Sequence, residues 1–186
     1  MAITIDATVG GTSTNVYATL LETDALAESM FATEAAAWLA LSDDETKAPF
    51  QVRAHRLVDT LAEYLGERVS STQSSEWPRW NVPRPGGGGS QFAYQGMYNC
   101  YASDEIPREL KLAESQLAIW LASRDQAGDD TFGLSGTAAL SALSVGPISL
   151  TFRDASSSDG STYFDDVIVP ILERGRLIRT SGRLIR

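Results

Sequence analysis

The longest helical pattern of the chain is Ser42–Gly66, which reads SDDETKAPFQVRAHRLVDTLAEYLG. Ser42 and Glu45 have the spacing of a capping box, and Gly66 is a common helix terminator. The stretch therefore predicts the longest helix of the fold, to about Leu65, with Pro49 as an alternative start or a bend. Its apolar residues recur at steps of three and four, as on one buried helix face: Phe50, Ala54, Leu57, Val58, Leu61 and Leu65.

Two further helical patterns flank this stretch. Thr19 and Glu22 form another capping box, which predicts a helix from about Leu20 to about Met30 with an alanine-rich continuation towards Trp38. Pro107 suits the first turn of a helix. An apolar stripe to about Ser123 follows it: Leu110, Ala113, Leu117, Trp120 and Leu121. A helical bundle is the expected core.

A short β-element is expected after the helices. Val145–Phe152 follows the alternation of a strand, and Ala138–Ser144 is its candidate hairpin partner. The predicted fold class is mainly α, a helical bundle core with a small β-hairpin and an extended C-terminal arm. The expected segments are an N-terminal arm or edge strand (1–16), the helical core (17–132), the hairpin (133–155), an apolar segment (156–173) and a basic arm (174–186).

A long loop, residues 70–105, is expected to interrupt the core. It holds prolines, the glycine run Gly86–Gly89 and several aromatic residues, which predict irregular structure pinned by aromatic side chains. Its candidate site residues are Trp77, Arg79, Trp80 and Arg84. They suit a subunit interface, or a stacking platform for single-stranded nucleic acid with arginines on the phosphates. The alternative is that the tryptophans fill the gap between the two long helices.

Charge divides the chain sharply near its end. Residues 1–173 hold all 24 Asp and Glu against ten Lys and Arg, a charge of −14, whereas residues 174–186 hold five arginines and no acid. Such a body repels nucleic acid, and such a segment favours an acidic surface. The motif GRLIR occurs twice there, at 175–179 and 182–186. The expected partner-binding residues are Arg174, Arg176, Leu177, Ile178, Arg179, Arg183, Leu184, Ile185 and Arg186; a solubilising terminus is the alternative.

Nothing in the sequence indicates catalysis. His55 is the only histidine and Cys100 the only cysteine, so neither an internal disulfide nor a typical zinc site is expected. We expect a structural histidine, no catalytic residue, no metal and no cofactor. No stretch approaches eighteen apolar residues and the N-terminus lacks a secretion pattern, so the expectation is synthesis in a cytoplasm without membrane contact.

Several short motifs occur in a characteristic order, and together they resemble a known family over most of residues 15–175. The motifs are Tyr17–Leu20, Ala54–Asp59, Leu65–Arg68, Trp77–Arg79, Glu105–Ala113, Val145–Ile148 and Val169–Leu172. In this order they resemble the tailed-phage head–tail connector (adaptor) proteins, a group that includes a DnaT-like single-stranded-DNA-binding family.

The resemblance implies a non-enzymatic structural protein of the virion, made in the host cytoplasm. It implies a homo-oligomeric ring, of twelve copies, beneath the phage portal protein at the head–tail interface. Such a ring extends the channel through which genomic DNA passes without sequence-specific contact. It also offers a platform to a downstream head-completion or tail protein, and its C-terminal segment commonly engages the portal. The alternative function is a single-stranded nucleic-acid-binding module.

Overall fold

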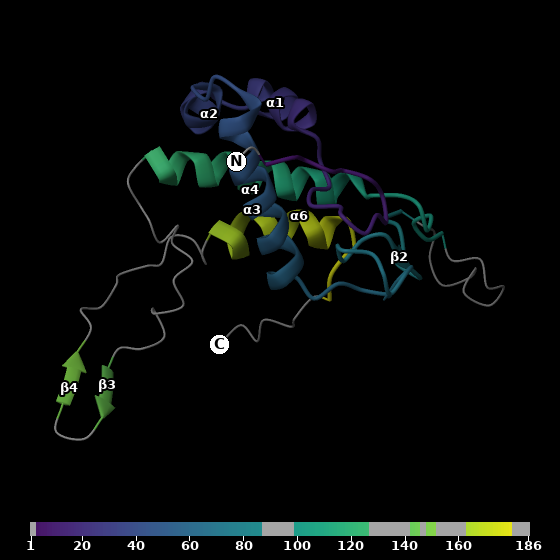
Figure 1. Ribbon diagram of the computed structural model, residues 1–186. Helices are drawn as coiled ribbons and strands as arrows, with labels where there is room; N and C mark the ends of the chain where they lie inside the picture. The colour runs from purple at the N-terminus through teal and green to yellow at the C-terminus, as the bar shows by residue number, and fades with distance from the viewer. Residues whose placement is uncertain (1–2, 87–98, 127–141, 146–147, 152–162, 180–186) are drawn as a thin grey trace.

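The computed structural model describes residues 3–86, 99–126, 142–145, 148–151 and 163–179 (Figure 1). It is mainly α-helical, which confirms the expected fold class. The described helical elements are α1 (Leu20–Ser29), α2 (Ala32–Leu39), α3 (Asp44–Leu61), α4 (Arg108–Gln126), the π-helical turn η3 (Phe164–Ile168) and α6 (Val169–Arg174).

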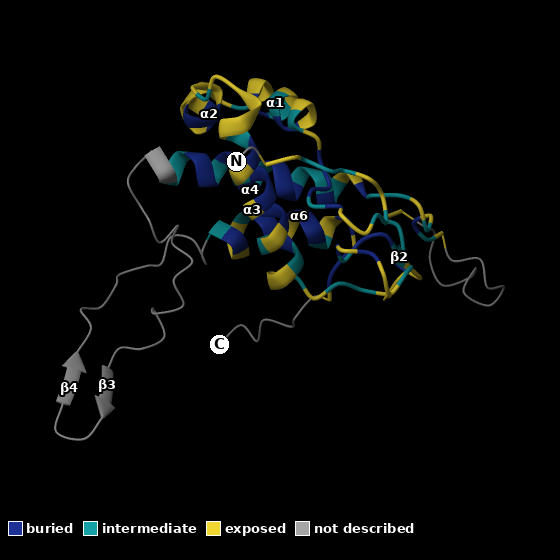
Figure 2. Ribbon diagram, viewed as in Figure 1, coloured by how far each residue is buried: buried dark blue, intermediate teal, exposed yellow. Residues whose placement is uncertain are grey.

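Helix α4 is the centre of the fold, because it packs against α1, α2, α3, η3 and α6. In Figure 1, α1 and α2 lie on one side of it and α6 lies on the other. Leu110, Leu117 and Leu121 of α4 are fully or almost fully buried, and Figure 2 shows the buried residues concentrated where the helices face one another. Burying one large aliphatic side chain contributes about 1.5–3 kcal/mol, so this contact layer is the main source of stability.

The helix starts follow local capping chemistry. In α1 the Thr19 side chain accepts a hydrogen bond from the Glu22 N–H, and the Glu22 side chain accepts one from the Thr19 N–H. This confirms the first capping box. The second prediction is wrong by one residue, because α3 is capped by Asp43, whose carboxylate accepts from the Thr46 N–H at 2.8 Å. Pro49 lies inside α3, in its second turn, where the missing N–H removes the hydrogen bond to the Glu45 carbonyl oxygen.

Helix α3 ends at Leu61, earlier than the sequence predicts. The chain becomes extended at Ala62 and turns at Gly66, whose φ of +71° favours glycine. A Cβ there would also collide with the carbonyl oxygen of Trp80. Gly66 therefore allows a close backbone crossing, and it does not terminate the helix.

Two small antiparallel sheets complete the described structure. β1 (Glu67–Arg68) pairs with β2 (Arg79–Trp80), a pairing that the sequence analysis missed because each strand has only two residues. β3 (Ala142–Val145) pairs with β4 (Ile148–Thr151), which confirms the expected hairpin. Val145 belongs to the first of these strands and pairs with Ile148, whereas the sequence analysis placed it in the second.

The first half of the basic arm is part of the folded body, and this corrects the expected partner-binding role of Leu177 and Ile178. The Leu177 side chain is fully buried and Ile178 is 8% exposed, both within the main hydrophobic core. The Leu65 N–H donates to the Leu177 carbonyl oxygen at 2.8 Å, and the Arg179 N–H donates to that of Glu63 at 3.0 Å. An apolar side chain that the chain itself buries is unavailable to a partner. Arg183, Leu184, Ile185 and Arg186 lie outside the described residues.

The burial of Leu177 gives a direct stability test. We expect Leu177→Ala to lower the free energy of unfolding by about 2–5 kcal/mol, because it leaves a cavity in the core. Leu21→Ala is the matched control, since Leu21 is 79% exposed and should change stability by less than about 0.5 kcal/mol. Urea denaturation of both variants measures the difference. Equal, small effects would show that the segment is not packed in the core.

Candidate functional site

The most highly connected side chain in the interior is the carboxylate of Glu114, which is fully buried on α4. It accepts hydrogen bonds from the backbone N–H of Tyr17 at 2.8 Å and of Ala18 at 3.2 Å. The side-chain amide of Gln51 on α3 donates to it at 2.6 Å. A buried carboxylate is very costly unless such donors replace its water shell. Glu114 therefore fastens the N-terminal segment and α3 to α4.

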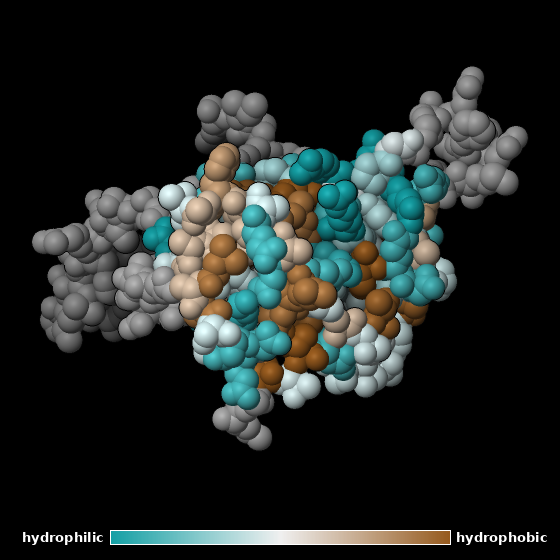
Figure 3. Space-filling model, turned by 90° about the horizontal axis from the view of Figure 1, so that it is seen from above, coloured by the Kyte–Doolittle hydropathy of each residue, from teal (hydrophilic) through white to brown (hydrophobic). Residues whose placement is uncertain are grey.

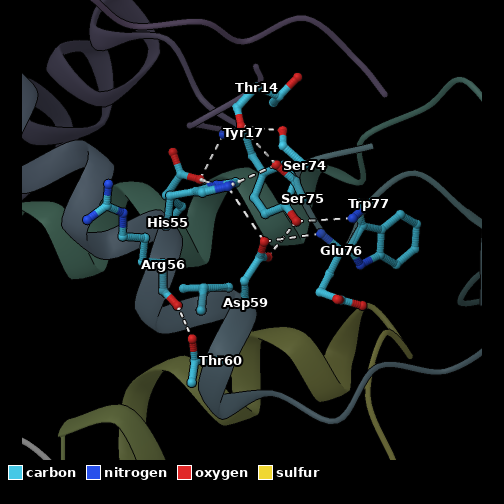
Figure 4. A network of polar contacts seen from close by, with 12 residues as sticks. Thr14, Tyr17, His55, Arg56, Asp59, Thr60, Ser74, Ser75, Glu76 and Trp77 are labelled. Carbon is cyan, nitrogen blue, oxygen red and sulfur yellow. Dashed lines mark hydrogen bonds and ion pairs between the residues drawn. The ribbon is translucent and has the colours of Figure 1, made fainter. Parts of the chain in front are cut away.

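His55 on α3 extends this network (Figure 4). Its Nδ1 lies 3.1 Å from Glu114 Oε2, and its Nε2 lies 3.0 Å from Ser75 Oγ and 3.5 Å from Asp59 Oδ2. The imidazole ring also lies against the Tyr17 ring, with 4.4 Å between centroids. Every polar atom of this histidine thus has a partner, as expected of a structural residue.

Asp59 links the same network to the aromatic residues. Its carboxylate accepts from the Tyr17 hydroxyl at 2.5 Å and from the Glu76 N–H at 3.1 Å. Burial raises the pKa of Asp59, although His55 and the Tyr17 hydrogen bond act in the opposite direction. The pKa of Tyr17 lies well above its usual value, first because of burial and then because of the neighbouring Asp59 charge. Both groups are therefore held in their protonated forms more firmly than in water.

A cavity of about 320 Å³ adjoins the network. Its lining residues come from the N-terminal segment, α3 and the loop after β1, and they expose both polar and apolar atoms to it: Thr14, Asn15, His55, Arg56, Asp59, Thr60 and Ser74. Among the described residues, no group of three or more His, Cys, Asp or Glu is arranged to hold a metal ion. The cavity offers hydrogen-bond donors and acceptors to water or a small polar group.

Ser75, His55 and Glu114 are hydrogen-bonded in the order of a Ser–His–acid triad. Ser75 is only 2% exposed, however, and does not line the cavity. Its hydroxyl also donates to the Thr14 carbonyl oxygen at 3.3 Å. A substrate carbonyl could not approach a nucleophile in this position. The arrangement instead joins the 70–77 loop to α3 and the N-terminal segment.

Sequence reasoning missed Glu114, Asp59 and Gln51 as members of this network. The signal for Glu114 was present, because it lies four residues after Leu110 and three before Leu117, within the apolar stripe of α4. A charged residue in a buried helix stripe usually has partners from elsewhere in the fold. Which elements supply those partners was not visible in the sequence.

Trp77, predicted as a surface contact, is fully buried. Its ring packs edge-on against Tyr64 at 6.2 Å and Tyr101 at 5.8 Å between centroids. The structure therefore corrects the prediction for Trp77 and favours the alternative, in which this tryptophan fills the core. Trp80 differs, because it is 48% exposed on β2.

The two loop arginines make internal contacts. The Arg79 guanidinium donates to the carbonyl oxygens of Leu65 at 2.8 Å and Gly66 at 2.7 Å, and it pairs with Glu76 at 2.5 Å. Arg84 pairs with Glu105 and lies 5.1 Å from the centre of the Tyr101 ring. Both guanidinium groups stabilise the loop through these internal contacts. This corrects the expectation that Arg79 and Arg84 are available to bind phosphates or another subunit.

The arginines of the described C-terminal segment differ from Arg79 and Arg84, because their side chains are not used in internal ion pairs among the described residues. Arg174, Arg176 and Arg179 are exposed and form no ion pair within the described part of the chain. Residues 177–179 bond to Glu63 and Leu65, and β2 pairs with β1 just beyond Gly66. The stretch Glu63–Arg68 thus contacts both parts, the arginine segment through Glu63 and Leu65, and exposed Trp80 through its strand partner Glu67. We call Trp80, Arg176 and Arg179 the Trp80 face.

Comparison with known families places the whole chain in one family. All of residues 1–186 match the family described as "Putative DnaT-like ssDNA binding protein". The chain belongs to this family. No curated protein and no solved structure matches it. The description of the family names single-stranded DNA as the ligand. None of these comparisons supports the resemblance to head–tail connector proteins.

None of the described helices in this DnaT-like protein is both long enough and apolar enough to cross a membrane.

The raised pKa of Asp59 predicts a pH dependence. The folded state keeps this proton to a higher pH than the unfolded chain, whose aspartate pKa is about 4. Stability contributed by Asp59 must therefore fall as pH rises from the unfolded pKa towards the folded pKa. Relative to the wild type, Asp59→Asn should gain stability as the pH is raised through this window in urea denaturation.

Asp6→Asn is the control with the opposite sign. Hydrogen bonds from Ser13 and Thr8 lower the pKa of Asp6, which lies at the surface. Its ionised form is favoured by folding, so Asp6→Asn should lose stability relative to the wild type as pH rises. A stability difference for Asp59→Asn that is independent of pH would show that Asp59 has an ordinary pKa.

Proposed function

We propose that the protein binds single-stranded DNA through the Trp80 face, without catalysis. The observation that carries the proposal is the position of Trp80: it is a half-exposed aromatic residue beside a segment whose arginines have no acidic partner among the described residues. The ligand class comes from the family to which the chain belongs.

Stacking and charge act together at such a surface. An exposed indole ring offers a face to any unpaired base, and arginines neutralise the neighbouring phosphates, so binding tolerates many sequences. The remainder of the protein is strongly acidic, with a charge of −14 over residues 1–173. Repulsion from this body restricts DNA contact to the Trp80 face and favours short single strands over long duplexes.

We expect Trp80→Ala to weaken binding of a fluorescent oligo-dT by about 5- to 150-fold, which corresponds to about 1–3 kcal/mol for one stacked base. Replacing Arg176 and Arg179 with glutamine should reduce the salt dependence, by about 0.7 in the log–log slope for each phosphate that is no longer neutralised. Fluorescence anisotropy at several salt concentrations measures both effects.

Phe31→Ala is the matched control. Phe31 is an 80% exposed aromatic residue, but it lies at the start of α2 in an acidic part of the surface. Its loss should leave oligonucleotide affinity unchanged. The proposal is wrong if Trp80→Ala binds as the wild type does, or if Phe31→Ala weakens binding equally.

A second candidate function is the head–tail connector to which the motif order points. Here the protein would form a homo-oligomeric ring, of twelve copies, under the portal at the head–tail interface of a virion. It would bind the portal and a downstream head-completion or tail protein. The observation that favours it is the exposed apolar surface of α2, together with an acidic body that would let DNA pass without adhesion. A protein channel through which DNA passes requires no catalytic activity.

For this second function, the useful truncation follows Arg179, because residues 174–179 are part of the fold. We expect a protein lacking residues 180–186 to fold with unchanged stability but to co-sediment less with portal rings. The removed residues supply two of the five C-terminal arginines and a Leu-Ile pair. Full co-sedimentation would remove residues 183–186 from any portal contact.

A further inference from the structure

Helix α2 is apolar at most of its positions, yet only part of it is buried. Ala35 and Trp38 face the core and are fully buried. A helix with apolar residues on opposite faces is normally covered on both. Its outward apolar positions are nevertheless exposed, and they recur at helical spacing up to the C-cap: Ala32, Ala36, Leu39 and Ala40. We call these four residues the α2 stripe.

Two large side chains add exposed apolar area to this surface. Leu39 is 46% exposed within the stripe, and Phe31, at the N-cap of α2, is 80% exposed. Figure 3 looks onto the side of the molecule that carries α1 and α2, and it shows apolar side chains at the surface, bordered by hydrophilic ones. Exposed apolar surface of this kind, with a polar border, is typical of a binding site.

The charge around the α2 stripe specifies the chemistry of its occupant. Residues 1–46 contain eight acidic residues and no Lys, Arg or His. Of these acids, Glu28, Glu34, Asp44 and Glu45 are exposed and form no ion pair with another described residue. An occupant that combines aliphatic side chains with positive charge would complement this border.

The chain itself contains a segment of this composition, and the structure shows how its first copy binds. In GRLIR at 175–179, Leu177 and Ile178 are buried while Arg176 and Arg179 stay at the surface. The same five residues recur at 182–186, with Leu184 and Ile185 between Arg183 and Arg186. The site that holds the first copy is already occupied, so the second copy requires another apolar surface.

The second motif cannot reach the α2 stripe of its own chain. Arg179 is bonded to Glu63, just beyond the end of α3, whereas α2 precedes the start of α3. Helix α3 has 18 residues, which at 1.5 Å each separate these points by about 27 Å. Leu184 lies five residues after Arg179, so a fully extended chain carries it at most about 18 Å.

We propose that residues 182–186 of one copy dock on the α2 stripe of a second copy. Leu184 and Ile185 pack on the alanines and Leu39, and Arg183 and Arg186 face the acidic border. The two surfaces differ, so the contact is head-to-tail and generates a closed ring or an open chain. This contact between copies goes beyond the proposed DNA binding and does not depend on it. It would also join neighbouring subunits in the ring of the second candidate function.

A complementation experiment tests the contact on the intact fold. One variant lacks residues 180–186, and the other carries Ala36→Arg, which places a bulky like charge in the stripe. In sedimentation velocity, the wild type should form oligomers at micromolar concentration and each variant alone should be a monomer. An equimolar mixture should form a one-to-one heterodimer, because one variant retains the stripe and the other retains the motif.

Val9→Arg is the matched control, since it adds the same charge at another exposed apolar residue, 43% exposed and outside α2; it should assemble as the wild type does. If Ala36→Arg fails to fold by circular dichroism, Leu39→Arg takes its place. A monomeric wild type, or a mixture that stays monomeric, overturns the proposal and leaves the stripe to a different protein. Oligo-dT binding by the truncated monomer, measured in parallel, reports separately on the Trp80 face.

Discussion

The mutual placement of the helices depends on one buried side chain. The carboxylate of Glu114 holds the backbone at Tyr17 and Ala18, the Gln51 amide and the His55 ring, which belong to segments far apart in the sequence. A buried carboxylate is stable only if protein donors replace all of the water molecules that would otherwise bind it. Losing one partner of such a cluster typically lowers the free energy of unfolding by about 3–5 kcal/mol. This requirement fixes the relative positions of α3, α4 and the N-terminal segment more narrowly than apolar packing alone would.

Internal polar chemistry and external binding surfaces are separated in this protein. The triad-like arrangement of Ser75, His55 and Glu114 is buried, with only His55 bordering the cavity, and it acts as a cross-link. The surfaces that remain open lie elsewhere: Trp80 beside the arginine segment, and the α2 stripe amid acidic residues. One combines aromatic and positive groups, and the other combines aliphatic and negative groups. The two proposed ligands, a nucleic acid and a basic peptide segment, therefore have separate surfaces.

Features set by neighbouring residues were predictable from the sequence, and features set by distant contacts were not. The Thr19 cap, the apolar stripe of α4 and the β3–β4 hairpin follow from local patterns, and the structure confirms them. Trp77 and Trp80 are only three residues apart, yet Tyr64 and Tyr101 enclose the first and leave the second exposed. The burial of Leu177 likewise depends on a backbone pairing with Leu65, over a hundred residues earlier, which no periodicity reveals.

The late position of Leu177 in the chain has a consequence for biosynthesis. During translation, α1 to α4 leave the ribosome well before the segment that completes their core. Until Leu172, Leu177 and Ile178 are made, the nascent protein exposes an apolar face that chaperones and proteases recognise. A chain that ends before Leu177 would thus lack side chains that complete the core.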